Sequence, residues 1–165
     1  MNKTQEQSYA GLLPIASFRV AWQPARVEPV DSPREAARRE RDVNTAALLP
    51  ELATAHGART AVASVGGPRL DFSHLSACAA ALGARLVAAG VRPGDRVALL
   101  AGAGPEWVTG FFGALNAGAV VVPLDAGLPE AEQSRLIEHA GAGRLLHAGE
   151  MSVAARELAA ATGVE

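Results

Sequence analysis

Cysteine is almost absent from this chain of 165 residues, which contains only Cys78. A single cysteine excludes a disulfide framework and a zinc site built from several cysteines, and it fits a reducing compartment. No apolar run comes near the ~20 residues that a membrane span needs. Residues 1–7 are polar, and Pro14 and Arg19 interrupt the apolar stretch that follows, so no signal peptide is expected. These absences predict a cytoplasmic protein without a membrane span.

Lysine is nearly missing as well, because Lys3 is the one lysine among 15 basic residues. Schiff-base chemistry, a P-loop phosphate contact and an activating ammonium group all require a lysine. None of these has a candidate beyond the N-terminal tail. A genome that favours arginine and alanine codons accounts for the bias, and the chemical consequence is the same.

Net charge is also low, at −2 at pH 7. So small a charge creates no field that attracts nucleic acid or an anionic membrane, and neither is expected as a partner. Apolar types make up 49% of the chain and charged types 19%, as in globular proteins. A chain of this length is the size of one domain and can bury a core without disulfides or metals.

Residues 1–44 have the character of an extension, with several prolines and no sustained periodicity. Within them, the alternation of apolar and other residues over positions 18–22 indicates a short edge strand. The sequence Ser-Pro-Arg-Glu at 32–35 is a capping box, which predicts a polar helix from Arg34 to about Val43. Arginines interspersed with acidic residues are typical of a solvated surface helix, and a docking patch is the alternative.

Residues 45–165 are expected to form the main domain, which opens with a helix and a hairpin. The helix is predicted over about 44–55, beginning or kinking at Pro50, because an interior proline costs ~3 kcal/mol. Strands are predicted over 60–65 and 69–72, with a turn at Gly66-Gly67.

From residue 73 onward, helices and strands alternate regularly. Ser73 is the expected N-cap of a helix that ends at Ala89, with one apolar stripe along it. The stripe consists of Leu75, Cys78, Leu82, Leu86 and Ala89. Strands are predicted over 96–101, 119–124 and 144–147, and helices from Pro105 to Gly118, from Pro129 to Gly141 and over 152–161.

This order favours parallel strands joined by helical crossovers. The predicted fold class is α/β, with an open, mostly parallel sheet and helices on both faces, preceded by the hairpin and the N-terminal extension. The pattern stops after Gly163, where another strand would normally begin. We therefore expect the chain to be part of a larger unit.

Gly102-Ala103-Gly104 lies between a strand and a helix, where a dinucleotide-binding fingerprint would lie. That fingerprint needs a third glycine at the position of Trp107, so that the helix can approach the strand. Glu106 also places a negative charge in the first helical turn, where a phosphate would bind. The glycines are therefore interpreted as a tight turn into a helix that starts at Pro105.

No constellation of catalytic or metal-ligating side chains is recognised. The histidines at 56, 74, 139 and 147 lack the spacing of metal ligands. Cys78 falls on the apolar stripe and is interpreted as a core residue rather than a nucleophile. Trp107, Phe111 and Phe112 are interpreted as core, because no basic groove accompanies them. The sequence thus assigns no catalytic, cofactor-binding or metal-binding residue.

Three stretches nevertheless carry short motifs in a fixed order. Residues 70–75 are Leu-Asp-Phe-Ser-His-Leu, and residues 90–97 are Gly-Val-Arg-Pro-Gly-Asp-Arg-Val. The third stretch begins with Pro-Glu-Trp at 105–107 and ends with Asn-Ala-Gly-Ala-Val-Val-Val-Pro-Leu-Asp at 116–125. In motif, order and spacing, residues 48–149 resemble the N-terminal subdomain of the adenylate-forming superfamily. That group holds AMP-dependent acyl-CoA synthetases, nonribosomal-peptide adenylation domains and luciferases.

The resemblance implies a ligase that activates a carboxylic acid with ATP and magnesium and transfers it to coenzyme A or a carrier thiol. Residues 121–129 weakly favour the acyl-CoA synthetase branch of fatty acid metabolism. Phe72, His74 and Asn116 depart from the family's motifs at positions that are mainly structural.

A larger difference from the family is that several of its functional elements are missing from this sequence. The family's phosphate-binding loop, ribose-binding aspartate, hinge and C-terminal lysine have no counterpart in these 165 residues. Adenylation needs donors and cations around the transferring phosphoryl group. The resemblance therefore assigns no catalytic or binding residue in this chain. We expect this chain alone to bind no cofactor and to form no acyl-adenylate.

Two interpretations of its role stay open. In the first, the chain is the N-terminal portion of a carboxylate–thiol ligase. Its partner is the remainder of that ligase, encoded by the same gene or present as a second chain. The exposed edge of its sheet is then expected to associate with other strands. In the second, it is a non-catalytic interaction module or split-enzyme partner derived from that family, which uses the extension and the arginine-rich helix as its contact surface. The sequence does not indicate which carboxylic acid the full enzyme would activate.

Overall fold

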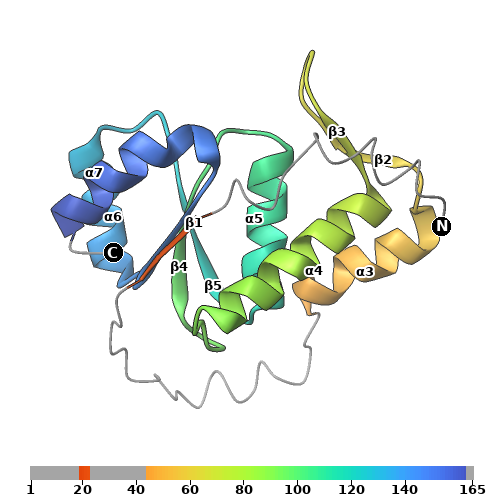
Figure 1. The fold of residues 1–165 in the computed structure, drawn as a ribbon, viewed down its shortest axis with the longest axis horizontal. Helices are drawn as coiled ribbons and strands as arrows, with labels where there is room; N and C mark the ends of the chain where they lie inside the picture. Colours follow the sequence, from red (N-terminus) through yellow and green to blue (C-terminus); the bar gives the residue numbers. More distant parts are fainter. Residues whose placement is uncertain (1–18, 23–43, 163–165) are drawn as a thin grey trace.

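A computed structural model of the protein describes residues 19–22 and 44–162, and its helices and strands follow the predicted order (Figure 1). The polar helix predicted over 34–43 lies outside the described residues. The elements are β1 (Arg19–Trp22), α3 (Thr45–His56), β2 (Thr60–Ala63), β3 (Arg69–Asp71), α4 (Phe72–Ala88), β4 (Arg96–Leu100), α5 (Pro105–Asn116), β5 (Val120–Leu124), α6 (Glu130–Ala140), β6 (Arg144–His147), η3 (Gly149–Met151) and α7 (Ser152–Thr162).

The main sheet has four strands in the order β1-β6-β4-β5. The strand β4 is parallel to both β5 and β6, whereas β1 is antiparallel to β6 and forms one edge. β2 and β3 form a separate antiparallel hairpin. The prediction of an open, mostly parallel α/β sheet with a preceding hairpin is therefore confirmed.

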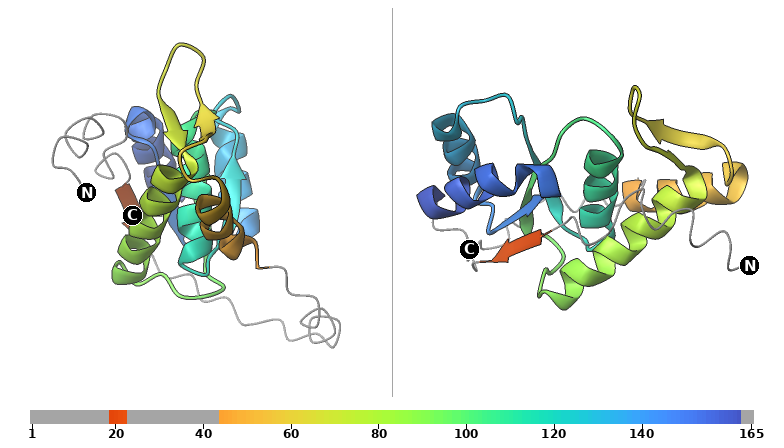
Figure 2. Two further views of the ribbon diagram at one scale, coloured as in Figure 1. Left: turned by 90° about the vertical axis from the view of Figure 1, so that its right-hand side faces the viewer. Right: turned by 45° about the horizontal axis from the view of Figure 1, so that its top comes forward.

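Helices cover both faces of this sheet, with α4 and α5 on one side and α6 and α7 on the other (Figures 1 and 2). Alternation along β4 supplies both cores. Val97 and Leu99 point toward α4 and α5, whereas Ala98 and Leu100 point toward α6 and α7. A strand buried on both faces needs apolar side chains at successive positions, which explains the continuous apolar run.

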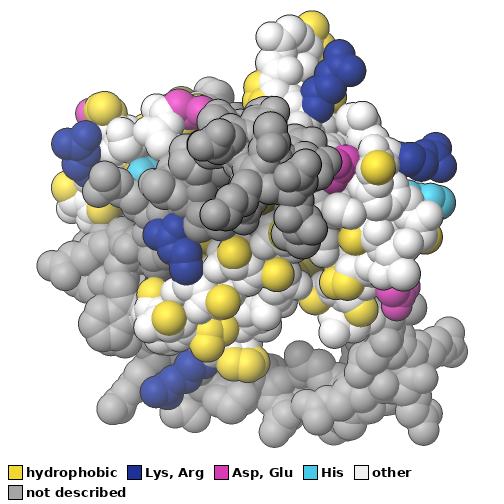
Figure 3. Space-filling model, turned by 45° about the vertical axis from the view of Figure 1, so that its right-hand side comes forward, with side chains coloured by type: hydrophobic (Ala, Val, Ile, Leu, Met, Phe, Trp, Pro, Cys, Tyr) yellow, Lys and Arg dark blue, Asp and Glu magenta, His cyan; other side chains and the backbone are white. Residues whose placement is uncertain are grey.

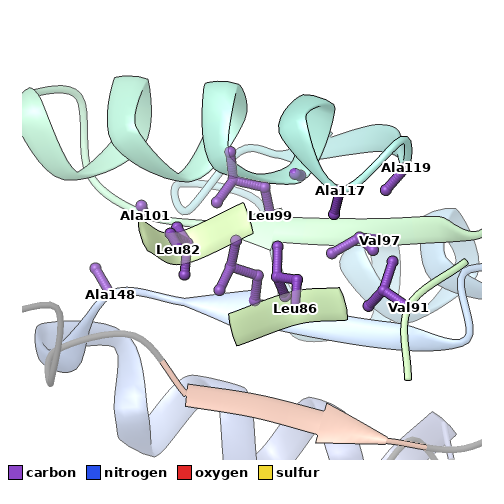
Figure 4. Close-up of a cluster of buried hydrophobic side chains, with 11 residues drawn as sticks. Leu82, Leu86, Val91, Val97, Leu99, Ala101, Ala117, Ala119 and Ala148 are labelled. Atoms are coloured by element: carbon purple, nitrogen blue, oxygen red, sulfur yellow. The ribbon is translucent and has the colours of Figure 1, made fainter. Parts of the chain in front are cut away.

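The larger of the two cores is filled by leucine and valine side chains from the sheet and from α4 (Figure 4). Leu82, Leu86 and Leu99 are at most 1% exposed. A third cluster joins α3, the hairpin and α4 around Leu49 and Leu75. The hairpin and α3 thus belong to the same packed unit as the sheet.

The helices α4 and α5 pack closely where each has a glycine at the contact. A methyl group at Gly113 would lie 2.6 Å from Leu82 Cδ2, and one at Gly83 would lie 2.7 Å from Asn116 Cβ. No larger side chain fits at either position without movement of the neighbouring helix.

The close contact between α4 and α5 also determines which face of α5 is buried. Trp107, Phe111 and Phe112, which the sequence predicts to be core, are only partly buried. The fully buried side of α5 consists of small residues, Thr109, Gly110, Gly113 and Ala114. Because α5 packs against both α4 and the sheet, small residues occupy the buried side of α5 and the large rings lie at its margins.

One predicted N-cap is wrong. The N-cap of α4 is Asp71 rather than Ser73, since the Asp71 carboxylate accepts the backbone N–H of His74 at 2.8 Å. The helix α3 matches the predicted range of about 44–55 and contains Pro50 instead of beginning there, and Asn44 caps it by accepting the N–H of Ala46. Burial of Leu49 and this cap offset the ~3 kcal/mol cost of an interior proline.

The apolar stripe predicted on α4 is partly confirmed. Leu75, Leu82 and Leu86 are buried, but Cys78 is half-buried and Ala89 is exposed. Across the described residues, no helix combines the length and the hydropathy that crossing a bilayer requires.

Candidate functional site

The carboxyl edge of the parallel sheet is the candidate functional site, because the crossovers diverge there. β4 leads through residues 101–104 into α5 on one face, and β6 leads through 148–151 into α7 on the opposite face. β4 and β6 are paired neighbours. In open α/β sheets, ligands bind in the crevice outside the carboxyl ends of two such strands.

Two glycines allow other segments to approach the β4–α5 loop at this edge. A methyl group at Gly104 would lie 2.9 Å from the Ser64 hydroxyl, which comes from the hairpin. A methyl group at Gly102 would lie 3.2 Å from a carboxylate oxygen of Glu150, which precedes α7. The two glycines thus allow the loop to pack closely against the hairpin and against the segment before α7. The helix after them starts at Pro105, as predicted.

Carboxylates dominate the charge at this edge. Glu106 lies in the first turn of α5, Glu130 and Glu132 lie in the first turn of α6, and Glu150 lies in η3. The connecting loops 101–104, 125–129 and 148–151 contain neither lysine nor arginine. The positive ends of these helix dipoles are therefore met by the chain's own carboxylates, and a phosphate would be repelled. The residues present do not fit a triphosphate.

Trp107 occupies the position that a third glycine would need in a dinucleotide fingerprint. Its ring stacks on Phe111 with centroids 5.3 Å apart and an interplanar angle of 10°. Phe111 in turn meets Phe112 edge-on at 5.5 Å. Trp107 and Phe111 pack against the larger core, and Phe112 packs against the third cluster. The three rings are therefore engaged in packing within this chain.

The β5–α6 turn is held by a buried amide that the sequence did not single out. Gln133, which is 5% exposed, donates from Nε2 to the carbonyls of Asp125 at 3.1 Å and Leu128 at 2.8 Å. The Asp125 carboxylate accepts the N–H of Gly127 at 2.8 Å. In the sequence, the only indication of these hydrogen bonds is a glutamine at the fourth position of α6. That indication is weak, because a glutamine at this position can equally be exposed.

The four histidines have different surroundings. The ring centroids of His56 and Phe72 are 5.9 Å apart. His139 is exposed in the last turn of α6, and His147 is buried at the end of β6. His74 Nδ1 lies 2.7 Å from an Asp71 oxygen. Within residues 44–162, no three His, Cys, Asp or Glu side chains gather in a way that could hold a metal ion.

Cys78 lies on α4, half-buried. Burial raises the pKa of its thiol above the ordinary value, because desolvation disfavours the thiolate. A reactive cysteine needs the opposite shift. The interpretation of Cys78 as a packing residue is therefore favoured.

A charged pair joins the amino ends of two neighbouring strands, away from the candidate site. Arg144 in β6, only 6% exposed, donates to the Asp95 carboxylate at 3.2 Å and to the Gly90 carbonyl at 3.1 Å. Burial lowers the pKa of Arg144, and the nearby Asp95 charge opposes that shift. Asp95 also accepts the N–H of Arg92 and so closes the turn before β4. This cluster ties the turn to the sheet.

Comparison with known proteins gives an independent view of the same residues. The sequence pattern of the family described as AMP-binding enzyme matches residues 49–164. The AMB antimetabolite synthetase AmbE of Pseudomonas aeruginosa is 36% identical over 140 residues, which cover 83% of this chain and 6% of that protein. The feruloyl-CoA synthase of a Streptomyces species is 41% identical over 95 residues, which cover 58% of this chain and 19% of that protein.

Comparison with solved structures points to the same group of enzymes. The N-terminal domain of FACL13 from Mycobacterium tuberculosis superposes with a TM-score of 0.61 at 27% identity, covering 68% of this chain and 28% of that domain. A fatty acyl CoA synthetase from the same organism gives a TM-score of 0.52 at 32% identity, covering 59% of this chain and 20% of that structure. The chain therefore spans a small share of each relative that it matches.

Proposed function

This chain belongs to the family of AMP-binding enzymes, and from that membership we propose that it forms the N-terminal portion of an ATP-dependent ligase that joins a carboxylic acid to a thiol. Its relatives are synthetases and ligases, and its resemblance to the N-terminal parts of such enzymes extends over sequence and fold alike. In the complete enzyme, ATP with magnesium would activate the acid, and coenzyme A or a carrier thiol would receive it.

The observation that carries the structural half of this proposal is the charge of the carboxyl edge. Glu106, Glu130 and Glu150 lie where a phosphate-binding α/β domain would present free helix N-termini. The triphosphate is thus proposed to bind to the rest of the ligase. The role of this chain is to hold the parallel sheet, the Gln133-clamped turn and the Trp107 cluster as a rigid support.

The proposed ligase is placed in the cytoplasm, since its chemistry uses ATP and a reduced thiol. A non-catalytic interaction module derived from the same family is the second candidate. The observation that favours it is again the lack of cations in the carboxyl-edge loops, which also suits a chain that never meets ATP.

A complementation experiment tests the proposal. The 165-residue chain is produced together with the Streptomyces feruloyl-CoA synthase from which the matched segment has been deleted. We expect ATP-dependent formation of feruloyl-CoA from the pair and none from either component. The same chain alone should give no ATP–pyrophosphate exchange with a panel of carboxylic acids.

Exchange by the chain alone would contradict its predicted inactivity. A stable complex that forms no feruloyl-CoA would favour the interaction module. The full-length synthase and an inactive variant of it serve as positive and negative controls.

A further inference from the structure

The strand β1 covers the edge of β6, although the two strands are far apart in the sequence. They run antiparallel, and every residue of β6 has a partner in β1, from Arg19 opposite His147 to Trp22 opposite Arg144. The strands β4, β5 and β6, in contrast, are parallel. An antiparallel strand on an otherwise parallel sheet is commonly an edge strand. Among the described strands, β1 is accordingly the last one on that side of the sheet.

The crossovers between the parallel strands indicate where such a sheet continues. From β4 to β5 the chain passes through α5 on one face of the sheet, and from β5 to β6 it passes through α6 on the opposite face. The second crossover also runs in the opposite direction across the sheet, since β4 lies between β5 and β6. Reversing both the face and the direction leaves the hand unchanged. The two crossovers therefore share one hand, as the strong preference for right-handed connections requires.

The helix α7 sets the direction of the next crossover. It follows β6 and lies on the same face as α6, where its Ala155 and Leu158 are buried. A crossover of the same hand on the same face has to run in the direction that took the chain from β5 to β6. It therefore leads to the outer edge of β6, which is the edge that β1 occupies. About 98% of such parallel connections are right-handed, so this direction is strongly favoured.

We propose that the outer edge of β6 is the docking site for a parallel β-strand from the remainder of the ligase, and that β1 covers this edge until that strand displaces it. This inference rests on the proposed function. The superposed part of the chain accounts for 28% of the related N-terminal domain, so most of such a domain lies outside it. Consecutive strands are neighbours in space about two-thirds of the time, which favours direct pairing with β6. Addition beyond β1 would instead enclose an antiparallel strand between parallel ones.

The exchange of strands changes the candidate functional site. Because β1 is antiparallel, it begins beside the carboxyl end of β6 and ends beside its amino end. A parallel strand in the same place ends at the carboxyl edge, and the loop that follows it lies beside residues 148–151. In open α/β sheets, the loops after neighbouring parallel strands form the ligand crevice. Displacement of β1 therefore brings a loop of the remainder of the ligase to the candidate site.

The other strand edges fit a continuing strand less well. Within the described part of the chain, no strand pairs with the outer edge of β5, but a crossover through α7 reaches that edge only with the opposite hand. The hairpin of β2 and β3 offers two further edges. It projects from the molecule (Figure 3) at the end remote from α7 (Figure 1). The edge of β6 is the one at which the direction, the face and the hand of the crossover agree.

Hydrogen exchange measured by mass spectrometry tests the displacement. The full chain is measured alone and with the probe, which is the Streptomyces feruloyl-CoA synthase without its matched segment. In the free chain, we expect the amides of residues 19–22 and 144–147 to exchange more slowly than in the urea-unfolded chain. In the complex, we expect the amides of 19–22 to exchange at least about tenfold faster than in the free chain. Those of 144–147 should stay protected, because the incoming strand replaces β1.

A pair of variants tests the competition for the edge. V20P/A21P removes two successive N–H groups of β1, and because successive N–H groups point to opposite sides of a strand, one of them is directed toward β6. V20T/A21S keeps both N–H groups and is the matched control. We expect V20P/A21P to bind the probe at least about fivefold more tightly than the original chain, and V20T/A21S to bind unchanged. If V20P/A21P does not fold by circular dichroism, the exchange measurement on the original chain decides.

Several results would overturn the inference: no complex with the original chain, β1 amides that stay protected in the complex, or equal or weaker binding by a folded V20P/A21P. Unprotected β1 amides in the free chain would overturn it as well, because β1 would then not cover the edge. The outcome is separable from catalysis. Release of β1 in a complex that forms no feruloyl-CoA supports the exchange and counts against the proposed function. An active complex in which β1 stays protected supports the proposed function and rejects the exchange.

Discussion

Asp71 links the hairpin to the helix that follows it through one carboxylate. That carboxylate accepts the His74 N–H at 2.8 Å and lies 2.7 Å from the His74 ring nitrogen. An aspartate in an extended conformation before a helix satisfies a backbone donor that would otherwise lack an intrahelical partner.

The first prediction concerns this cap. D71A should lower the free energy of unfolding by about 1 kcal/mol, because the cap is lost. S73A should change it by less than about 0.5 kcal/mol, because the exposed Ser73 does not cap the helix. Urea unfolding followed by circular dichroism measures both. A larger loss in S73A than in D71A would contradict the assigned cap.

The second prediction concerns Cys78. Because burial raises the pKa of its thiol, little thiolate is present near pH 8 and iodoacetamide should react more slowly than with the urea-unfolded chain. The folded state favours the protonated thiol, so its contribution to stability is present at neutral pH and is lost as the pH rises through the raised pKa. Mass spectrometry measures the alkylated fraction of Cys78 as a function of time. Equal rates in folded and unfolded chains would show that the thiol is not protected.

At the level of elements, the contact between α4 and α5 decides how the helical layer packs. Gly83 and Gly113 let the helix axes approach until Leu82 fills the space beside Gly113. This contact also explains why the large rings of α5 lie at its margins.

The third prediction concerns that contact. Glycine to alanine within a helix ordinarily stabilises it by up to about 1 kcal/mol. G113A should instead destabilise the chain by about 1–3 kcal/mol, since its methyl group would lie 2.6 Å from Leu82. A160G on exposed α7 measures the propensity effect alone. A gain of stability in G113A would show that the two helices are farther apart than described.

At the scale of the whole molecule, stability should depend on a partner. A protein that binds only the folded chain stabilises it by about 2.7 kcal/mol when present at a hundred times the dissociation constant. The proposed function makes the remainder of the ligase the proposed partner.

The fourth prediction follows from this linkage. The melting temperature of the chain should rise with the concentration of the segment-deleted feruloyl-CoA synthase and should not respond to albumin. Differential scanning fluorimetry with a label on the chain measures it. A melting temperature that stays constant while binding is observed would mean that the partner also binds the unfolded chain.

Much of the order of elements was predictable because its causes are local. The run Val97–Leu100 is apolar at every position, so it predicts a strand buried on both faces. Gly90, Gly118 and Gly141 adopt positive φ of 86°, 76° and 63° where helices end, a conformation that glycine reaches without strain. The prediction of Ser73 as the N-cap failed because serine and aspartate can both cap, and only the backbone conformation shows that Asp71 is the extended residue.

The candidate site at the carboxyl edge and the Arg144 cluster at the opposite edge were less predictable, since their contacts join segments distant in sequence. Arg144 lies 49 residues from Asp95 and 54 from Gly90, and no local pattern indicates those partners. Nor does periodicity show that Ser64 meets Gly104 or that Glu150 meets Gly102. Hydrogen bonding and backbone sterics within a few residues determine a helix or strand from the sequence alone. The sheet order and the acidic carboxyl edge are decided only by tertiary packing, because each depends on which surfaces distant segments bury against one another.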